Sequence, residues 1–369
     1  MPTRRTASLL TTAQPEQSRG AGQVIVSQPK LDGAGPLTDS MSARLFMAGG
    51  GALIRLVEGN AMTTVIVFGG SGFLGRPLVR HLIAEGATVR VAVRHLDRAQ
   101  SVLHAAGPDR VTVFRVDVRD RASVATAVAG ADAVVNAVSA YVEKGGVTFE
   151  AVHEHGAETI AREAAAAGVT RLVLVSGIGA DPGSGSPYIR ARGRGELVVR
   201  QAFPGATIIR PGAMFGPGDA LFGTLAELTR LLPVLPLIGG GRTRLQPVYV
   251  EDVAEAISRM LADPGTAGQT YEVAGPGVYT LRELVGIALH LIGRRRLLVP
   301  VPFAVAEVQA RLLELLPSPP LTTSQVDLLK ADNVASGALP GFRELNIRPK
   351  AVEEIVPTYI GRSRSPEPD

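Results

Sequence analysis

Apolar residues follow two alternating patterns along the chain after residue 63. Short runs rich in β-branched residues, of which 64–68 (TVIVF) is the clearest, are typical of strands buried on both faces of a sheet. These runs predict six strands, at 64–68, 87–93, 111–116, 133–137, 171–176 and 206–210. Between them, helical spacing of apolar residues predicts helices after the first strand and over 151–167 and 188–203. This alternation predicts a Rossmann-type α/β fold, a doubly wound parallel sheet covered by helices on both faces.

The alternation weakens after Pro211. Helical patterns follow, separated by Pro and Gly clusters, with short extended pieces near 246–250 and 270–273. These helices are predicted over 219–232, 251–262, 280–292 and 301–316. We therefore expect a Rossmann domain over 62–211 and a smaller, mostly helical C-terminal lobe over 212–361, in which strands of the sheet can recur.

The two ends of the chain differ from the rest in composition. Residues 1–61 are rich in Ser, Thr, Gly and Ala and show little apolar periodicity. Their acid-poor, Arg- and Ser-containing start resembles a transit peptide, but we expect a disordered extension upstream of an alternative start at Met62. The polar tail 362–369 (RSRSPEPD) is also expected to be disordered.

Composition argues against several classes of protein. The 38 Lys and Arg are interspersed with 34 Asp and Glu, and the resulting charge of +4 does not predict a nucleic-acid-binding face. No uninterrupted run of about 18 apolar residues occurs, so no transmembrane helix is expected. We expect a cytoplasmic protein that binds no nucleic acid.

We also expect no metal site. The chain contains 0 Cys, which removes thiolate nucleophiles and zinc sites of the cysteine type. His153 and His155 are two positions apart and face different directions on a helix, so we expect them, with Glu154 and Glu158, to be surface residues.

A glycine-rich turn follows the first predicted strand. Gly69 permits a tight turn, Gly72 lets the backbone approach a pyrophosphate, and Gly75 allows the helix to pack closely on the strand. The start of the helix adds unpaired N–H groups and a partial positive charge. The turn is thus a candidate pyrophosphate site, although an ordinary βα turn is the alternative; its residues are Gly69, Gly70, Ser71, Gly72, Phe73, Leu74 and Gly75.

Arginines at the end of the second strand indicate which dinucleotide is bound. NAD-specific sites place an acid there for the ribose hydroxyls, whereas this chain has Arg94, with His95 and Arg98 beside it. Because a guanidinium pairs with a 2′-phosphate, we expect NADP(H) to be preferred over NAD(H), unless Arg94 is only a solvated charge. Asp117 and Val118, after the third strand, are candidates for the adenine contact or for simple turn chemistry.

A serine, a tyrosine and an arginine form the second candidate site. Ser176 ends the fifth strand, and Tyr188 and Arg192 lie one helical turn apart on the same face. A tyrosine base at neutral pH needs a nearby cation and a hydrogen-bonded partner, which this set offers. The cofactor-binding candidates also include Asn136 and Pro211, at the ends of the fourth and sixth strands.

These motifs together resemble the extended and atypical short-chain dehydrogenases, which share an epimerase/dehydratase-like fold. Within that superfamily the chain is most similar to the NADPH-binding accessory subunits of respiratory complex I and their bacterial homologues. The resemblance covers roughly 63–360 and is carried by 69–75, 188–196, 203–211, 215–219, 246–254 and 321–333. It implies that Arg210 faces the cleft, although a charge that merely ends a strand is the alternative.

One departure from the family pattern bears on activity. Family enzymes carry Tyr-x-x-x-Lys, whereas the fourth position here is Arg192. Arginine can lower the tyrosine pKa and bind the nicotinamide ribose, but its pKa above about 12 makes a proton relay unfavourable. We therefore expect a nucleotide held as a structural element. The alternatives are an active reductase or epimerase on a lipid-like, quinone or nucleotide-sugar substrate, with Ser176 and Tyr188 as the acid/base pair, or an NmrA-like cofactor-sensing regulator.

Two apolar stretches predict either a core or a docking surface. Residues 228–238 are punctuated by Pro, and residues 299–316 carry few charges. Arg294, Arg295 and Arg296 precede the second stretch and could meet anionic head groups. We expect complex I subunits as partners and peripheral contact with the inner face of the respiratory membrane.

Overall fold

The structure is a computed structural model that describes residues 63–99, 110–316 and 321–360. The predictions for 1–61 and 362–369 lie outside the described residues. In the described part of the chain, no helix is both long and apolar enough to cross a bilayer.

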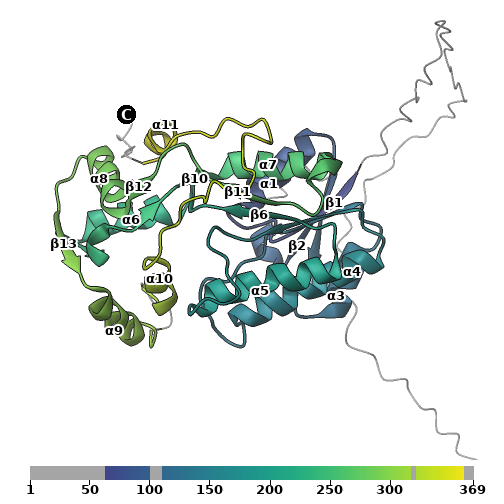
Figure 1. Cartoon of the computed structure of the whole chain (residues 1–369), viewed down its shortest axis with the longest axis horizontal. Helices are drawn as coiled ribbons and strands as arrows, with labels where there is room; N and C mark the ends of the chain where they lie inside the picture. Colours follow the sequence, from purple (N-terminus) through teal and green to yellow (C-terminus); the bar gives the residue numbers. More distant parts are fainter. Residues whose placement is uncertain (1–62, 100–109, 317–320, 361–369) are drawn as a thin grey trace, which may run out of the picture.

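A seven-stranded parallel sheet lies at the centre of the molecule, in the order β11-β6-β5-β4-β1-β2-β3 (Figure 1). The strand order reverses between β1 and β4, which is where nucleotides bind in sheets of this kind. The strands are β1 (Thr64–Phe68), β2 (Thr88–Val93), β3 (Val111–Arg115), β4 (Ala133–Asn136), β5 (Arg171–Val175), β6 (Thr207–Pro211) and β11 (Thr270–Val273). The predicted Rossmann-type α/β fold is confirmed.

Helices cover both faces of this sheet. The core on one face is closed by α1 (Gly75–Ala84) and α7 (Val250–Ala262), and the core on the other by α3 (Arg121–Val128), α4 (Ala157–Ala166) and α5 (Pro187–Ala202). Along β1, Val65 and Val67 enter the first core, and Ile66 and Phe68 enter the second. Burial on both faces explains why this strand is continuously apolar.

The seventh strand comes from the extended piece predicted near 270–273. Although β11 follows the second lobe's first elements in sequence, it pairs in parallel with β6 at the edge of the main sheet. Helix α7, just before it, packs on α1. The chain therefore returns to the first lobe after Pro211, and the proposed division at that residue does not separate the lobes in space.

The second lobe holds the remaining helices and three short strand pairs. Its core includes Phe215, Phe222, Leu284 and Val356. The helices are α6 (Leu221–Leu231), α8 (Leu281–Ile292), α9 (Phe303–Leu313), α10 (Thr323–Leu328) and α11 (Val352–Ile355). The strand pairs are β7 (Met214–Phe215) with β10 (Val248–Tyr249), β9 (Arg244–Leu245) with β12 (Tyr279–Thr280), and β8 (Val234–Ile238) with β13 (Leu297–Val301).

Two helix predictions need correction. The predicted helix 301–316 begins at Phe303, because Pro302 stands at its N-cap and the residues before it form β13. The predicted helix 151–167 begins as a π-helix over Glu150–Gly156 and becomes α-helical only in α4. A π-helix differs from an α-helix by one residue in each hydrogen-bonded turn, which apolar spacing does not reveal.

Candidate functional site

The turn after β1 is shaped by its glycines. Gly69 adopts φ of 82°, and a Cβ there would lie 2.8 Å from the carbonyl oxygen of Ala137. A Cβ at Gly75 would overlap the backbone of Gly69 and Gly70. Both positions therefore require glycine if α1 is to start this close to the sheet.

The start of α1 offers free backbone donors. Its N-cap, Leu74, provides no side-chain hydrogen bond, and the first turn carries no acid. A Cβ at Gly72 would meet only the Gly69 carbonyl oxygen within 4 Å, so little of the protein crowds this backbone. Ser71 is half-buried, and Leu74 is buried in the core, so any contact from Leu74 is through its backbone. This end of α1 has the donors and the partial charge that suit a phosphate.

Charged residues follow the neighbouring strands β2 and β3. Arg94 is exposed, and within the described residues it makes no hydrogen bond or ion pair. Asp117 is held by Arg119, whose Nη2 donates to Oδ2 at 2.6 Å. Hydrogen bonding from Arg119 lowers the pKa of Asp117, and the charge of Arg94 adds to this effect. Arg94 is thus a cation at the carboxyl end of β2 without a committed partner among these residues.

Four other candidates lie around this edge of the sheet. The side chain of Arg98 falls outside the described residues, although its backbone lies in a short 3-10 helix. Val118 is buried in the core, and Asn136 is buried with its Oδ1 accepting the Val138 N–H. Pro211 ends β6, and its carbonyl accepts the Ile178 N–H at 3.1 Å.

The predicted tyrosine and arginine come together on α5. The Tyr188 side chain is only 4% exposed and lies among three rings. Tyr141 stacks on it at 5.6 Å, while Phe149 and His153 meet it edge-on, each at 5.4 Å. The Arg192 guanidinium covers the tyrosine ring, with Cζ 5.0 Å from the ring centre.

Burial sets the protonation states at this site. It raises the pKa of Tyr188 well above its ordinary value, and the charge of Arg192 offsets only part of that effect. It also lowers the pKa of His153 to about 3. The tyrosine is therefore a protonated donor at neutral pH, and a general base would need a pKa near the working pH.

Three buried polar side-chain atoms have no hydrogen-bond partner within the described residues; one is the Ser186 Oγ, at the N-cap of α5, and the other two lie around Gly177. These two are the Ser176 Oγ, directly after β5, and the Arg192 Nε. Arg192 is otherwise engaged, since its Nη2 donates to Ser139 Oγ at 3.3 Å. Because buried polar atoms almost always have partners, these two mark a place where polar ligand atoms fit.

The expectation that His153 is a surface residue is wrong. It is 7% exposed, and its Nε2 lies 3.1 Å from the Ala140 carbonyl oxygen, facing the Tyr188 site. Apolar spacing could not reveal this burial, because the ring that His153 meets lies 35 positions further along the chain. His155 does lie on the surface, where one of its ring nitrogens lies within 4.8 Å of carboxylate oxygens of Glu150 and Glu154.

With this geometry in place, comparison with known proteins identifies the family. Residues 69–264 match the family described as NAD(P)H-binding. Over 315 residues the chain is 34% identical to the Arabidopsis thaliana protein named NADH dehydrogenase (ubiquinone) 1 alpha subcomplex subunit 9, mitochondrial, covering 82% of this chain and 78% of the relative. The chain belongs to the NAD(P)H-binding family, alongside the subunit 9 proteins. Its α/β lobe is an NAD(P)H-binding domain.

Other relatives in this NAD(P)H-binding family carry two kinds of name. The NADH-ubiquinone oxidoreductase 40 kDa subunit of Neurospora crassa is 32% identical over 303 residues, covering 82% of this chain and 80% of the relative. A protein of Caulobacter vibrioides named ceramide reductase is 31% identical over 244 residues, covering 66% of this chain and 75% of the relative.

Solved structures share the fold at lower identity. The dTDP-glucose 4,6-dehydratase DesIV of Streptomyces venezuelae, with NAD and TYD bound, has a TM-score of 0.64 at 23% identity, covering 81% of this chain and 96% of that one. The UDP-glucose 4-epimerase of Thermus thermophilus, in complex with NAD, has a TM-score of 0.60 at 21% identity. The match covers 81% of this chain and 98% of the epimerase. These structures confirm the fold that the family resemblance implied.

Proposed function

We propose that this chain holds NADP(H) as a lasting structural ligand and serves as an accessory subunit of respiratory complex I. The observation that carries the proposal is the environment of Tyr188, which is buried among aromatic rings and covered by Arg192. A tyrosine so placed can donate a hydrogen bond but is a poor base. Subunit names among relatives that match over most of both chains support the choice of partner.

The residues present fit the parts of such a nucleotide. Backbone N–H groups of the turn over 69–75 that are not used within the turn itself would hold the pyrophosphate, as helix starts do elsewhere. Tyr188 and Arg192 would hold the nicotinamide ribose, and Ser176 has an unpaired hydroxyl to offer nearby. When bound, the reduced nicotinamide can supply a hydride, but a permanently held nucleotide instead stabilises the fold by binding only the native state.

Preference for NADP(H) over NAD(H) rests on Arg94. Its guanidinium is exposed after β2, where the ribose of the adenosine half lies in folds of this kind. Asp117, the acid that follows the adjacent strand β3, is held by Arg119. A cation free to pair with a 2′-phosphate favours the phosphorylated nucleotide.

We also propose peripheral contact with the inner face of the respiratory membrane. The two apolar stretches noted in the sequence form β8, β13 and α9, with Leu235 and Leu237 buried beneath them. These elements and the turns beside them expose apolar side chains, which we call the apolar patch, and Arg294 and Arg295 are exposed before β13. Apolar side chains flanked by arginines suit the head-group region of an anionic bilayer. The patch consists of Leu232, Val234, Leu297, Val299, Val305, Val308, Leu312, Leu315 and Leu316.

A second function is favoured by one comparison. Similarity to the Caulobacter ceramide reductase supports an NADPH-dependent reductase acting on a lipid-like carbonyl compound. In that case Ser176 and Tyr188 would form the acid/base pair, and ligand binding would have to displace Tyr141 or His153 to lower the tyrosine pKa.

Two experiments separate these functions. Affinity purification of the tagged chain from detergent-solubilised membranes of its source should recover complex I subunits, and recovery of the chain alone would contradict the accessory role. Absorbance of reduced nicotinamide, followed in the presence of long-chain ketones, should stay constant, whereas steady consumption would establish the reductase.

A further inference from the structure

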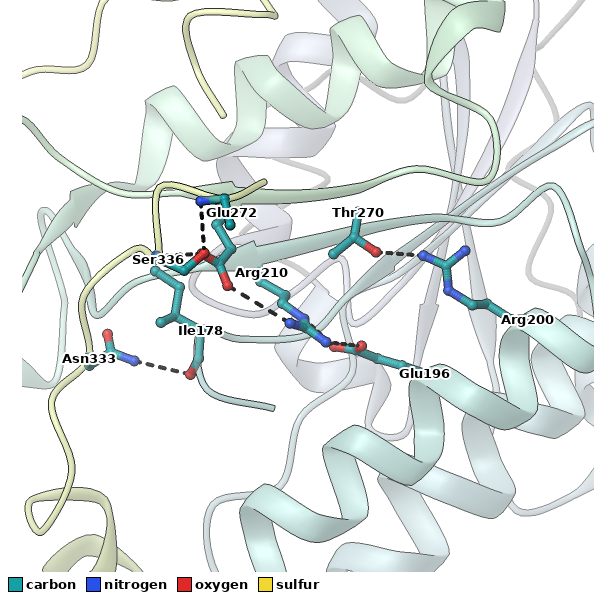
Figure 2. A network of polar contacts seen from close by, with 9 residues as sticks. Ile178, Glu196, Arg200, Arg210, Thr270, Glu272, Asn333 and Ser336 are labelled. Atoms are coloured by element: carbon teal, nitrogen blue, oxygen red, sulfur yellow. Dashed lines mark hydrogen bonds and ion pairs between the residues drawn. The ribbon is translucent and has the colours of Figure 1, made fainter. Parts of the chain in front are cut away.

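The segment before residue 334 carries part of the family resemblance but no role so far. Helix α10 begins with a capping box at Thr322, and the chain then runs back to the sheet. There Asn333 reaches the carboxyl ends of β5 and β6, and Figure 2 shows its amide directed at Ile178. The segment thus brings a C-terminal residue to the edge where the nucleotide is proposed to bind.

The hydrogen-bonding groups of Asn333 join three parts of the chain. Its Oδ1 accepts the Ala213 N–H at 2.9 Å, and its Nδ2 donates to the Ile178 carbonyl at 3.3 Å. Its backbone donates to the Arg244 carbonyl at 2.8 Å and accepts the Gln246 N–H at 2.9 Å. Both ends of the amide are used, so the side chain has one defined orientation.

The residue before Ile178, which Asn333 holds through its carbonyl, lies against Arg192. A Cβ added to Gly177, the residue before Ile178, would overlap the Arg192 Nη1. The guanidinium therefore packs directly on this glycine. Ile178 is also fixed through its N–H, which donates to the Pro211 carbonyl at 3.1 Å.

An ion-pair network joins α5 to β6 and β11 (Figure 2). Glu196, one helical turn along α5, accepts from Arg210 Nη2 at 2.6 Å. Arg210 also lies 3.8 Å from Glu272 on β11, whose Oε2 accepts both the N–H and the hydroxyl of Ser336 at 2.7 Å. Residues 333–336 and α5 are therefore joined both through the sheet and through the Gly177–Ile178 segment.

We propose that Asn333 is a positioning residue that fixes the Gly177–Ile178 segment against Arg192 and so aims the guanidinium at the nicotinamide half of the nucleotide. The inference rests on the nucleotide-binding role proposed above. Asn333 itself need not touch the ligand. Loss of its amide donor would free the Ile178 carbonyl. The Gly177–Ile178 segment and the Arg192 guanidinium could then shift together.

Two ligands and two variants test this inference. NADPH spans both halves of the site, whereas 2′,5′-ADP contains only the phosphorylated adenosine half. Asn333→Asp keeps the acceptor for Ala213 but loses the donor to Ile178, and Asn333→Leu loses both. We expect each variant to weaken NADPH binding about tenfold in calorimetry, the scale of one lost buried hydrogen bond, and to leave 2′,5′-ADP binding unchanged.

Asp332→Asn is the matched control, because this neighbour contacts Arg244 on the surface and should leave both affinities unchanged. Unchanged NADPH binding in both Asn333 variants would overturn the inference. Equal weakening of both ligands would also overturn it, since that result would mean a general structural role. If the unaltered chain bound neither ligand, the proposed function would fail and the inference with it.

Discussion

The Arg192 guanidinium lies over the face of the Tyr188 ring, with Cζ 5.0 Å from the ring centre. Its Nη2 also donates to Ser139. A planar cation that never loses its proton can stabilise the ring and orient a ligand, but it cannot relay protons as a lysine does. This relationship favours holding a nucleotide over turning it over.

Adding a methyl group at residue 177 should weaken nucleotide binding without unfolding the protein. In Gly177→Ala the new Cβ would displace the Arg192 Nη1, the far end of a flexible side chain, so we expect little change in melting temperature. We expect NADPH to bind about tenfold more weakly in calorimetry.

Replacing Arg192 with lysine, a shorter cation, should restore NADPH binding in the Gly177→Ala variant. In Gly177→Ala with Arg192→Lys, NADPH affinity should recover, because an ammonium leaves room for the methyl group. Gly223→Ala, in the interior of α6 with no atom within 4 Å of its Cβ, is the control and should stabilise the chain by up to about 1 kcal/mol. Equal NADPH affinities for Gly177→Ala and for the double variant would contradict the claim that Arg192 packs directly on Gly177.

Replacing Arg94 should change which nucleotide binds. Arg94→Ser removes the exposed guanidinium after β2, so NADPH should lose about tenfold or more in affinity while NADH binding stays the same. Titration of both nucleotides by fluorescence measures this directly, since the chain contains 0 Trp. Tighter binding of NADH than of NADPH by the unaltered chain would refute the stated preference.

Acid should destabilise the protein through His153. Burial lowers the pKa of this imidazole to about 3 from its ordinary value of 6.5, so the unfolded chain takes up the proton first. The stability contributed by the neutral ring is therefore complete above pH 6.5 and declines as the pH falls towards 3. We expect this residue alone to lower the free energy of unfolding by about 1.4 kcal/mol per pH unit in that range.

Urea unfolding at several pH values measures the slope of the free energy of unfolding against pH. His153→Leu should flatten it, while His155→Leu, which alters an exposed imidazole, should leave it as in the unaltered protein. An identical slope in both variants would show that His153 does not titrate as described.

The apolar patch should mediate membrane binding. Val308→Glu with Leu312→Glu places two charges on side chains that are 57% and 64% exposed, so the fold should tolerate them. Flotation with anionic vesicles at low salt should fall sharply in this variant but not in Leu197→Glu, which alters an exposed residue of the other lobe. If the unaltered chain fails to float with anionic vesicles, direct membrane contact is excluded.

The sequence predicted six strands of the central sheet better than it predicted the edge strand β11 and the strands of the second lobe. Buried β-branched runs identified six strands to within one residue at each end, because burial on both faces leaves a continuous apolar signal. Strands β8 and β13 each contain a proline and pair with each other in a separate small sheet, so their apolar residues predicted only a core or a docking surface. β11 is short and carries the buried Glu272, whose partner Arg210 lies far away in sequence.

The candidate site was predictable only where its residues are close in sequence. Spacing placed Tyr188 and Arg192 on one face of α5, and it placed Gly69–Gly75 at the start of α1. Spacing could not reveal the rings of Tyr141 and Phe149 that enclose the tyrosine, nor the reach of Asn333 to Ile178. These contacts depend on how distant segments pack, and they decide whether the tyrosine can act as a base.

The most direct test of the account is to identify the nucleotide that remains bound through purification. Mass spectrometry of the intact native protein, followed by chromatography of the material released on denaturation, gives its identity, redox state and amount. The account predicts about one NADP(H) per chain, retained through gel filtration and protecting the fold against heat. Protein that is fully folded, free of nucleotide and unable to bind added NADPH would contradict it.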